Sequence, residues 1–136
     1  MFSIVIPIFN EENNITNTLN NIKEYFSKLD QNYGFTALPK GERFYNRNRL
    51  KRIAYVFINE KRYAEAEAII NYWLSFYPQS ANAFDTLADL YRAQENVNTE
   101  LKYRIKALKL AQDNQDFRLP LFKAALMQTQ EKIRDR

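Results

Sequence analysis

The sequence predicts an all-α protein in which two helical hairpins stack between a leading helix and a capping helix. Three observations lead to this fold class. The chain has 136 residues but only two Gly and four Pro, so it offers few turns and favours long helices. Apolar residues recur at helical spacing over most of its length. The pattern of residue types at Leu50–Phe57 also returns at Phe84–Tyr91, as in a helical repeat.

Composition limits the chemistry of the chain. Hydrophobic residues make up 46% and aromatic residues 15%, which is enough core material for a single helical domain over residues 1–136. The sequence contains no Cys and no His. Disulfides, zinc sites of the usual ligands, thiol nucleophiles and Ser–His–Asp relays are therefore excluded. We expect no catalytic residue, no cofactor and no metal in this chain.

Targeting and charge signals are weak. No apolar run of about 18 residues exists, so no membrane span is predicted. Met1–Asn10 lacks the basic start of a signal peptide, which makes the cytoplasm the default compartment and leaves an exported parent protein open. The net charge of +4 allows an acidic partner and does not require nucleic acid.

The N-terminal part is predicted to contain an extended segment, one helix and a loop. Residues 1–14 form the extended segment, because Phe2–Phe9 is rich in β-branched residues and is broken by Pro7. Residues 15–29 form the leading helix, and Asp30–Gly41 forms the loop. The apolar stripe of the helix recurs at spacings of four and three: Ile15, Leu19, Ile22, Phe26 and Leu29.

Residues 42–80 are predicted to form the first hairpin. Two apolar stripes of helical period are separated by a polar break at Asn59–Lys61, and Pro78 ends the second helix. The stripes comprise Leu50, Ile53, Ala54, Phe57 and Ile58, then Tyr63, Ala66, Ile69, Ile70, Trp73 and Leu74.

Residues 81–114 are predicted to form a second, divergent hairpin, with Ser80 as the N-cap of its first helix. Its apolar positions are Phe84, Leu87, Ala88 and Tyr91, then Leu101, Ile105, Ala107 and Leu108. Glu100 and Arg104 stand where the first hairpin has small and aliphatic residues, and no proline closes the unit.

Residues 116–134 are predicted to be a capping helix, with Asp116 as its N-cap. Its inward side carries Leu119, Phe122, Leu126 and Ile133. We expect a polar outer side, because a helical stack needs a polar surface at its end.

The spacing of the first hairpin resembles the tetratricopeptide pattern, a repeat of about 34 residues. The signature positions hold Leu50, Ile53, Ala54, Phe57, Ala66, Ile70 and Pro78. Trp73 departs from the pattern, which has alanine there, and an ordinary helical hairpin is the alternative. The resemblance implies a right-handed superhelix in which the first helix of each pair lines a concave groove.

A longer stretch, from Leu19 to Gln112, resembles the helical C-terminal domain appended to bacterial esterases of the α/β-hydrolase superfamily. The likeness is carried by IKEYFSKLDQNYGF, by the first hairpin and by YPQSANAFDTLADLY at Tyr77–Tyr91. This resemblance implies a larger parent protein with a catalytic serine domain, and none of its catalytic residues would lie in this chain.

The segment SIVIPIFNEENNI, within Phe2–Leu29, resembles the opening strand and loop of family-2 glycosyltransferases with the GT-A fold. That family also needs a D-x-D metal motif and alternating strands and helices. The chain has no D-x-D, and its pattern is helical after Leu29. A truncated glycosyltransferase is therefore the last of the alternatives.

Candidate contact residues lie on the first helices of the two hairpins. The repeat register places on the groove side Asn48, Lys51, Tyr55 and Asn59, then Asn82, Asp85, Asp89 and Arg92. A protein or peptide segment is the expected ligand. The groove could instead be filled by the chain's own N-terminal segment or by a parent's catalytic domain. Tyr55 stands where a clamp for a terminal carboxylate needs asparagine, so no such clamp is predicted.

Two other charged regions have less specific interpretations. Lys40–Arg62 is rich in Lys and Arg with interleaved aromatics, and a solvated helix face or a protein contact is favoured over single-stranded nucleic acid. Glu65 and Glu67 should point to different sides of one helix, so they are not paired catalytic acids. Asp113 and Asp116 are expected to cap helices.

The sequence therefore predicts a non-catalytic protein-interaction module, the accessory C-terminal domain of a larger esterase-like hydrolase. Its partner would be a protein or peptide segment, the parent's own catalytic domain or a second copy of the chain. A free-standing peptide-binding adaptor is the first alternative.

Overall fold

The computed structural model describes residues 14–33 and 50–135, with the backbone alone for residue 14 and residues 25–33. Every element in these ranges is a helix, which confirms the all-α class for the described part of the chain. The helices are α1 (Asn14–Tyr33), α3 (Lys51–Asn59), α4 (Tyr63–Phe76), α5 (Ala81–Ala93), α6 (Val97–Asp113) and α7 (Leu119–Arg134). Phe2–Phe9, most of the predicted loop and the start of the first hairpin lie outside the described residues.

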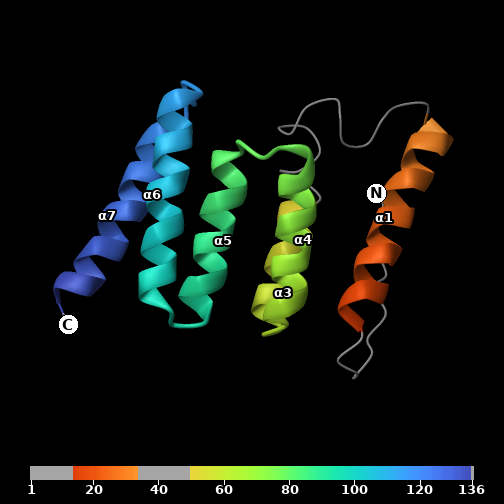
Figure 1. Ribbon diagram of the computed structural model, residues 1–136, viewed down its shortest axis with the longest axis horizontal. Coiled ribbons are helices and arrows are strands. Elements are labelled where there is room, and N and C mark those ends of the chain that lie inside the picture. The colour runs from red at the N-terminus through yellow and green to blue at the C-terminus, as the bar shows by residue number, and fades with distance from the viewer. Residues whose placement is uncertain (1–13, 34–49, 136) are drawn as a thin grey trace.

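The helices stand side by side, and neighbours from α4 to α7 run in opposite directions (Figure 1). α3 packs on α4 and on α5, while α6 packs on α5 and on α7. The two hairpins α3–α4 and α5–α6 therefore lie next to one another. α1 packs on α4, and α7 closes the opposite end of the row (Figure 1).

The leading helix is longer than predicted. α1 continues to Tyr33, beyond the expected end at Leu29, so the first residues of the predicted loop are helical. The reason is local, because no Pro or Gly occurs between Leu29 and Tyr33 and Gly34 is the first residue that favours a turn.

Three helices end in the same kind of turn. The residues that take a positive φ are Lys61 (61°), Glu95 (58°) and Gln115 (53°). At the first turn, Arg62 N donates to Phe57 O over 2.8 Å and Lys61 N donates to Ile58 O over 3.0 Å. The other two turns repeat both bonds, so each is a Schellman motif, which usually has Gly at the left-handed position. Lys61 and Glu95 occupy equivalent positions of the two hairpins, at the offset that the sequence pattern shows.

The helix caps agree with the sequence at most positions. Ser80 Oγ accepts from Ala83 N over 3.0 Å, which confirms Ser80 as the N-cap of α5. α4 ends at Phe76, just before Pro78. The prediction for Asp116 is wrong by two positions, because Arg118 is the N-cap of α7. Asp116 instead accepts from Arg118 N over 2.9 Å and orders the turn that precedes the helix.

Two apolar clusters form the core. The larger joins α1, α3, α4 and α5, and contains Ile22, Leu50, Ile53, Ala54, Phe57, Ile58, Ala66, Ile69, Ile70, Trp73, Ala83, Leu87 and Leu90. The smaller joins α5, α6 and α7, and contains Ala81, Ala107, Leu110, Ala111 and Phe122. Trp73 is fully buried, whereas Ala107 occupies the equivalent position of the second hairpin. The large side chain fits on α4 because three helices, α1, α3 and α5, pack around it.

The expected polar outer side of α7 is partly wrong. Phe122 is buried, and Leu119, Leu126 and Ile133 are half-buried, as their spacing indicates. Leu121 and Met127, however, are 68% and 58% exposed. The end of the helical row therefore presents apolar surface.

Glycine at the left-handed positions should stabilise the fold. This conformation costs other residues about 1–2 kcal/mol, against an entropic cost for glycine of about 0.5–1 kcal/mol. We expect Lys61→Gly and Glu95→Gly each to raise the free energy of unfolding by about 0.5–1 kcal/mol in urea denaturation followed by circular dichroism. Lys109→Gly, at an exposed position inside α6, is the matched control and should lower it by about 1 kcal/mol. Destabilisation by the first two changes would contradict the Schellman geometry.

Candidate functional site

The predicted contact residues on α3 and α5 lie opposite one another. Lys51 Nζ donates to Asn82 Oδ1 over 2.9 Å, and the Tyr55 hydroxyl donates to the Asp89 carboxylate. Residues spaced by four share one face of a helix, so these two bonds join one row on α3 to one row on α5. The rows therefore meet across the α3–α5 contact.

The remaining predicted residues lie at the ends of these rows or outside them. Asn59 is exposed at the end of α3, and the Arg92 side chain is 54% exposed near the end of α5. Arg92 also lies 3.4 Å from Asp89 Oδ1, a distance typical of a loose surface ion pair. Asp85 points toward α6, as its contacts with Arg104 show, and Asn48 lies outside the described residues.

Arg104 of α6 is the centre of a buried ion cluster. Its side chain is 3% exposed. One terminal nitrogen donates to Asp85 Oδ1 over 2.7 Å and to the Asp85 carbonyl over 3.1 Å. The other donates to Asp89 Oδ1 over 2.7 Å and to Glu100 Oε2 over 3.4 Å. The planar guanidinium thereby links α6 to both acidic residues of the α5 row.

Glu100 continues the cluster into α7. Its side chain is 2% exposed, and its carboxylate accepts from Thr129 Oγ1 over 2.8 Å and from Lys132 Nζ over 2.6 Å. The Lys51–Asn82 pair adjoins this cluster, because Lys51 Nζ lies 5.9 Å from the centre of the Tyr55 ring. A set of neighbouring polar side chains therefore crosses α3, α5, α6 and α7. We call this set the polar network: Lys51, Tyr55, Asn82, Asp85, Asp89, Glu100, Arg104, Thr129 and Lys132. It holds three cations and three carboxylates, so its formal charges cancel.

Burial raises the pKa of two members of the polar network, Asp85 and Tyr55. Burial raises the pKa of the Asp85 carboxyl above its ordinary value, although the Arg104 guanidinium opposes this shift. Burial, and then the nearby Asp89 carboxylate, raise the pKa of the Tyr55 hydroxyl. Tyr55 therefore remains a neutral hydrogen-bond donor to Asp89 well above neutral pH.

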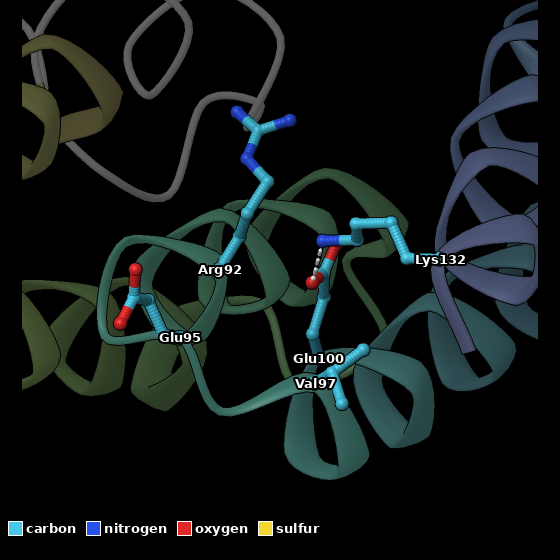
Figure 2. A pocket seen from close by; sticks show the side chains of 5 residues that line it. All are labelled: Arg92, Glu95, Val97, Glu100 and Lys132. Atoms are coloured by element: carbon cyan, nitrogen blue, oxygen red, sulfur yellow. Dashed lines mark hydrogen bonds and ion pairs between the residues drawn. The ribbon is translucent and has the colours of Figure 1, made fainter. Parts of the chain in front are cut away.

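A charged pocket of about 390 Å³ lies where the ends of α5 and α7 meet the start of α6. Its lining residues are Arg92, Glu95, Val97, Glu100 and Lys132 (Figure 2). The Lys132 ammonium turns toward the Glu100 carboxylate, while Arg92 and Glu95 point away from that pair (Figure 2). Two cations and two carboxylates line the pocket, so the charges balance and favour neither an anionic nor a cationic ligand.

No arrangement in the described ranges indicates a bound ion or a membrane span. Within residues 14–33 and 50–135, no three Asp or Glu side chains converge as metal ligands, and the carboxylates around Arg104 are bridged by its guanidinium. The same ranges contain no helix with the length and apolar character needed to cross a bilayer. The polar network holds helices together by charge-assisted hydrogen bonds.

The other acidic and basic candidates take part in contacts between elements. Glu65 accepts from Thr18 of α1 over 3.4 Å and from Arg62. Glu67 accepts from the Tyr91 hydroxyl of α5 over 2.7 Å. The two glutamates therefore face different helices, which confirms that they point to different sides of α4. Arg62, at the end of the basic stretch, pairs with Glu65 and more loosely with Glu60.

Sequence reasoning missed four members of the polar network. In the sequence, Glu100 and Arg104 stand out only because they differ from the repeat pattern. Thr129 and Lys132 resemble ordinary residues of the capping helix. One signal could have found the first two, since an acid and an arginine four residues apart on the inward stripe of a helix must be paired if they are buried. Thr129 and Lys132 carry no comparable signal.

No family model, no curated protein and no solved structure matches the chain.

Loss of the Arg104 guanidinium should destabilise the protein strongly. Arg104→Met keeps an unbranched apolar stem but leaves Asp85, Asp89 and Glu100 without their shared counter-charge. We expect the free energy of unfolding to fall by about 3–5 kcal/mol in urea denaturation, as for other broken buried ion pairs. Lys109→Met, at an exposed position of the same helix, should change it by less than about 0.5 kcal/mol. Similar unfolding free energies for the two variants would mean that the buried cluster contributes nothing to stability.

Tyr91 should couple stability to alkaline pH. The hydrogen bond to the Glu67 carboxylate, with burial, raises the pKa of Tyr91 from 10.0 to about 12. A raised folded-state pKa contributes stability that is complete below pH 10.0 and is lost as the pH rises through about 12. Tyr91→Phe should remove that part of the pH dependence of the unfolding free energy.

Absorbance of the phenolate group gives the direct measurement. In Glu67→Gln the Tyr91 hydroxyl loses its charged acceptor, so its titration should move back toward 10.0. An unchanged titration in this variant would show that the Glu67 carboxylate is not the cause of the shift.

Proposed function

We propose that this chain is a non-catalytic protein-interaction module of the tetratricopeptide-like kind. The observation that carries the proposal is the repeated turn, because Lys61 and Glu95 share one left-handed conformation at equivalent positions, each between paired helices. The packing of α3 on α5 supports it, since the first helices of neighbouring repeats lie side by side in such stacks. The departures at Glu100 and Arg104 are compatible with a stack, because these side chains pair inside it.

The proposed contact surface is the row of polar residues on α3 and α5. Its middle is preorganised by the bonds Lys51–Asn82 and Tyr55–Asp89, and preorganised groups lose little entropy on binding. Its exposed end residues are Asn59 and Arg92. An amide and a guanidinium at these places suit a peptide segment that offers backbone carbonyls or an acidic side chain.

We further propose that the module is an accessory domain of a larger esterase-like hydrolase. The support is the sequence resemblance of Tyr77–Tyr91, which covers most of α5 and the turn before it. The helices around this stretch share the resemblance. The parent's catalytic domain or a second copy of the chain would then be the partner. A free-standing peptide-binding adaptor is the alternative. A glycosyltransferase fragment gains no support, because all elements among the described residues are helices.

Selection of peptides from a displayed random library on the purified chain tests the contact surface. Peptides that recognise it should lose about tenfold or more in affinity when Asn59→Ala and Arg92→Ala are combined, because few residues carry most of a binding energy. Lys109→Ala, on an exposed position of α6, is the control and should leave affinity unchanged. Equal binding to both variants would place the contact elsewhere.

A second measurement addresses the absence of catalysis. The purified chain should not hydrolyse p-nitrophenyl acetate above the rate of a heat-denatured sample. Hydrolysis that is abolished by Tyr55→Phe would contradict a non-catalytic role, whereas Tyr55→Phe otherwise only removes the hydrogen bond to Asp89.

A further inference from the structure

A row of aromatic rings crosses from α5 to α6. The Tyr103 ring of α6 is stacked with Phe84 and with Tyr91 of α5, at centroid distances of 6.0 and 5.6 Å and interplanar angles of 24° and 27°. Phe84 and Tyr91 are seven residues apart, so they lie on one face of α5, and the Tyr103 ring contacts both. All three side chains are half-buried, so the row reaches the surface.

Two lysines of α6 lie over these rings. Lys106 Nζ is 5.7 Å from the centre of the Phe84 ring, and Lys102 Nζ is 5.5 Å from the centre of the Tyr103 ring. Lys109 extends the same stripe, because residues at spacings of four and three share one face of a helix. All three lysines are exposed. We call this surface the basic seam: Phe84, Tyr91, Lys102, Tyr103, Lys106 and Lys109.

The charges of the basic seam are not neutralised within the described part of the chain. Arg62, Arg104 and Lys132 each pair with a carboxylate of a described residue. None of the three seam lysines has such a carboxylate among the described residues. Glu67 of α4 adjoins the seam, where it accepts a hydrogen bond from the Tyr91 hydroxyl. One carboxylate against three ammonium groups leaves an excess of positive charge.

We propose that the basic seam binds an acidic helix of a partner protein. Lys102, Lys106 and Lys109 follow one another along α6 at rises of about 6 Å and about 4.5 Å, since each residue adds about 1.5 Å. Glutamates at spacings of four and three on a partner helix have the same rises, so they meet the lysines when the two helices lie alongside. Helices already pack alongside one another in this chain, as α6 does on α5.

The rings prepare the lysines for this contact. An ammonium group over an aromatic face is attracted to the ring, which restricts the long lysine side chain. A restricted side chain loses less conformational entropy when it pairs with a carboxylate. The half-buried rings also offer apolar surface to the methylene groups of a glutamate.

Two other occupants fit the seam less well. Single-stranded nucleic acid binds by stacking its bases on free aromatic faces, whereas these rings already stack on one another and lie under lysines. A second copy of the chain lacks the acidic stripe, because each helix has at most one exposed carboxylate among the residues whose side chains are described. A different protein with an acidic helix is therefore preferred.

The basic seam shares no residue with the contact row on α3 and α5. Its test leaves Asn59 and Arg92 unchanged, so failure of this proposal and failure of the proposed function can be told apart.

Titration calorimetry of the full chain with synthetic peptides tests the proposal. Each peptide has about 18 residues, roughly five helical turns, on an alanine background, and circular dichroism checks that their helix contents match. The first peptide carries glutamates in one stripe at spacings of four and three. The second spreads the same number of glutamates around the helix, and the third carries lysines in the stripe. We expect the glutamate stripe to bind about tenfold more tightly than the lysine stripe and about threefold more tightly than the spread glutamates, and to weaken as salt is added.

Variants locate the binding surface. Lys102→Gln combined with Lys106→Gln should weaken the binding of the glutamate-stripe peptide by about tenfold. Lys102→Arg combined with Lys106→Arg keeps both charges and should stay within about twofold of the unaltered chain. Lys123→Gln combined with Arg134→Gln removes the same charge from exposed positions of α7, and this matched control should leave the affinity unchanged.

Equal affinities for the glutamate and lysine stripes, or for the stripe and the spread glutamates, would overturn the proposal. Equal losses in the α6 and α7 glutamine variants would do the same, because the peptide would then respond to net charge alone. A single-stranded oligothymidylate that binds more tightly than the glutamate stripe, and that Lys102→Gln with Lys106→Gln weakens, would make nucleic acid the occupant instead.

Discussion

The ion cluster around the Arg104 guanidinium is the interaction on which the C-terminal half of the structure depends. Its two terminal nitrogens bind Asp85 and Asp89 of α5 and Glu100 of α6, and Glu100 in turn binds Thr129 and Lys132 of α7. Through Asp89 and Tyr55 the same cluster reaches α3. Buried charges are tolerated only when each is paired, so every member constrains the position of the others. The Nε atom of Arg104 has no acceptor among the described residues, which leaves one donor of the cluster outside this pairing.

Directional bonds matter here because the apolar contacts at this end of the molecule are few. Three of the five residues in the smaller cluster are alanines, so little apolar area is available to align α5, α6 and α7. Apolar burial also has no preferred direction, whereas hydrogen bonds require a particular distance and angle. The larger cluster, with Trp73 and Phe57, gives the N-terminal hairpin more apolar burial. The two halves of the row therefore depend on apolar burial to different degrees.

This division shapes the surfaces that remain for partners. Most candidate groove residues on α3 and α5 take part in the polar network, so the middle of that row is rigid and its ends are exposed. The opposite character occurs at the end of the row, where Leu121 and Met127 of α7 are exposed. One surface is therefore polar and charge-balanced, and the other is apolar.

The sequence by itself determined the helices, their apolar stripes, the Ser80 cap and the repeat offset that relates the two hairpins. The helices, stripes and cap depend on residues within one or two helical turns of each other, so periodicity and turn chemistry are sufficient to predict them. The repeat offset follows from comparing the two stretches of sequence directly. The tertiary structure alone decided that Arg104 binds Asp85 and Asp89 of α5, that Tyr55 binds Asp89, and that Trp73 fits where the second hairpin has Ala107. It also decided that Leu121 and Met127 stay exposed on a helix expected to be polar outside. Each of these outcomes depends on which helices pack together, and side chains far apart in the chain carry no local signal of that choice.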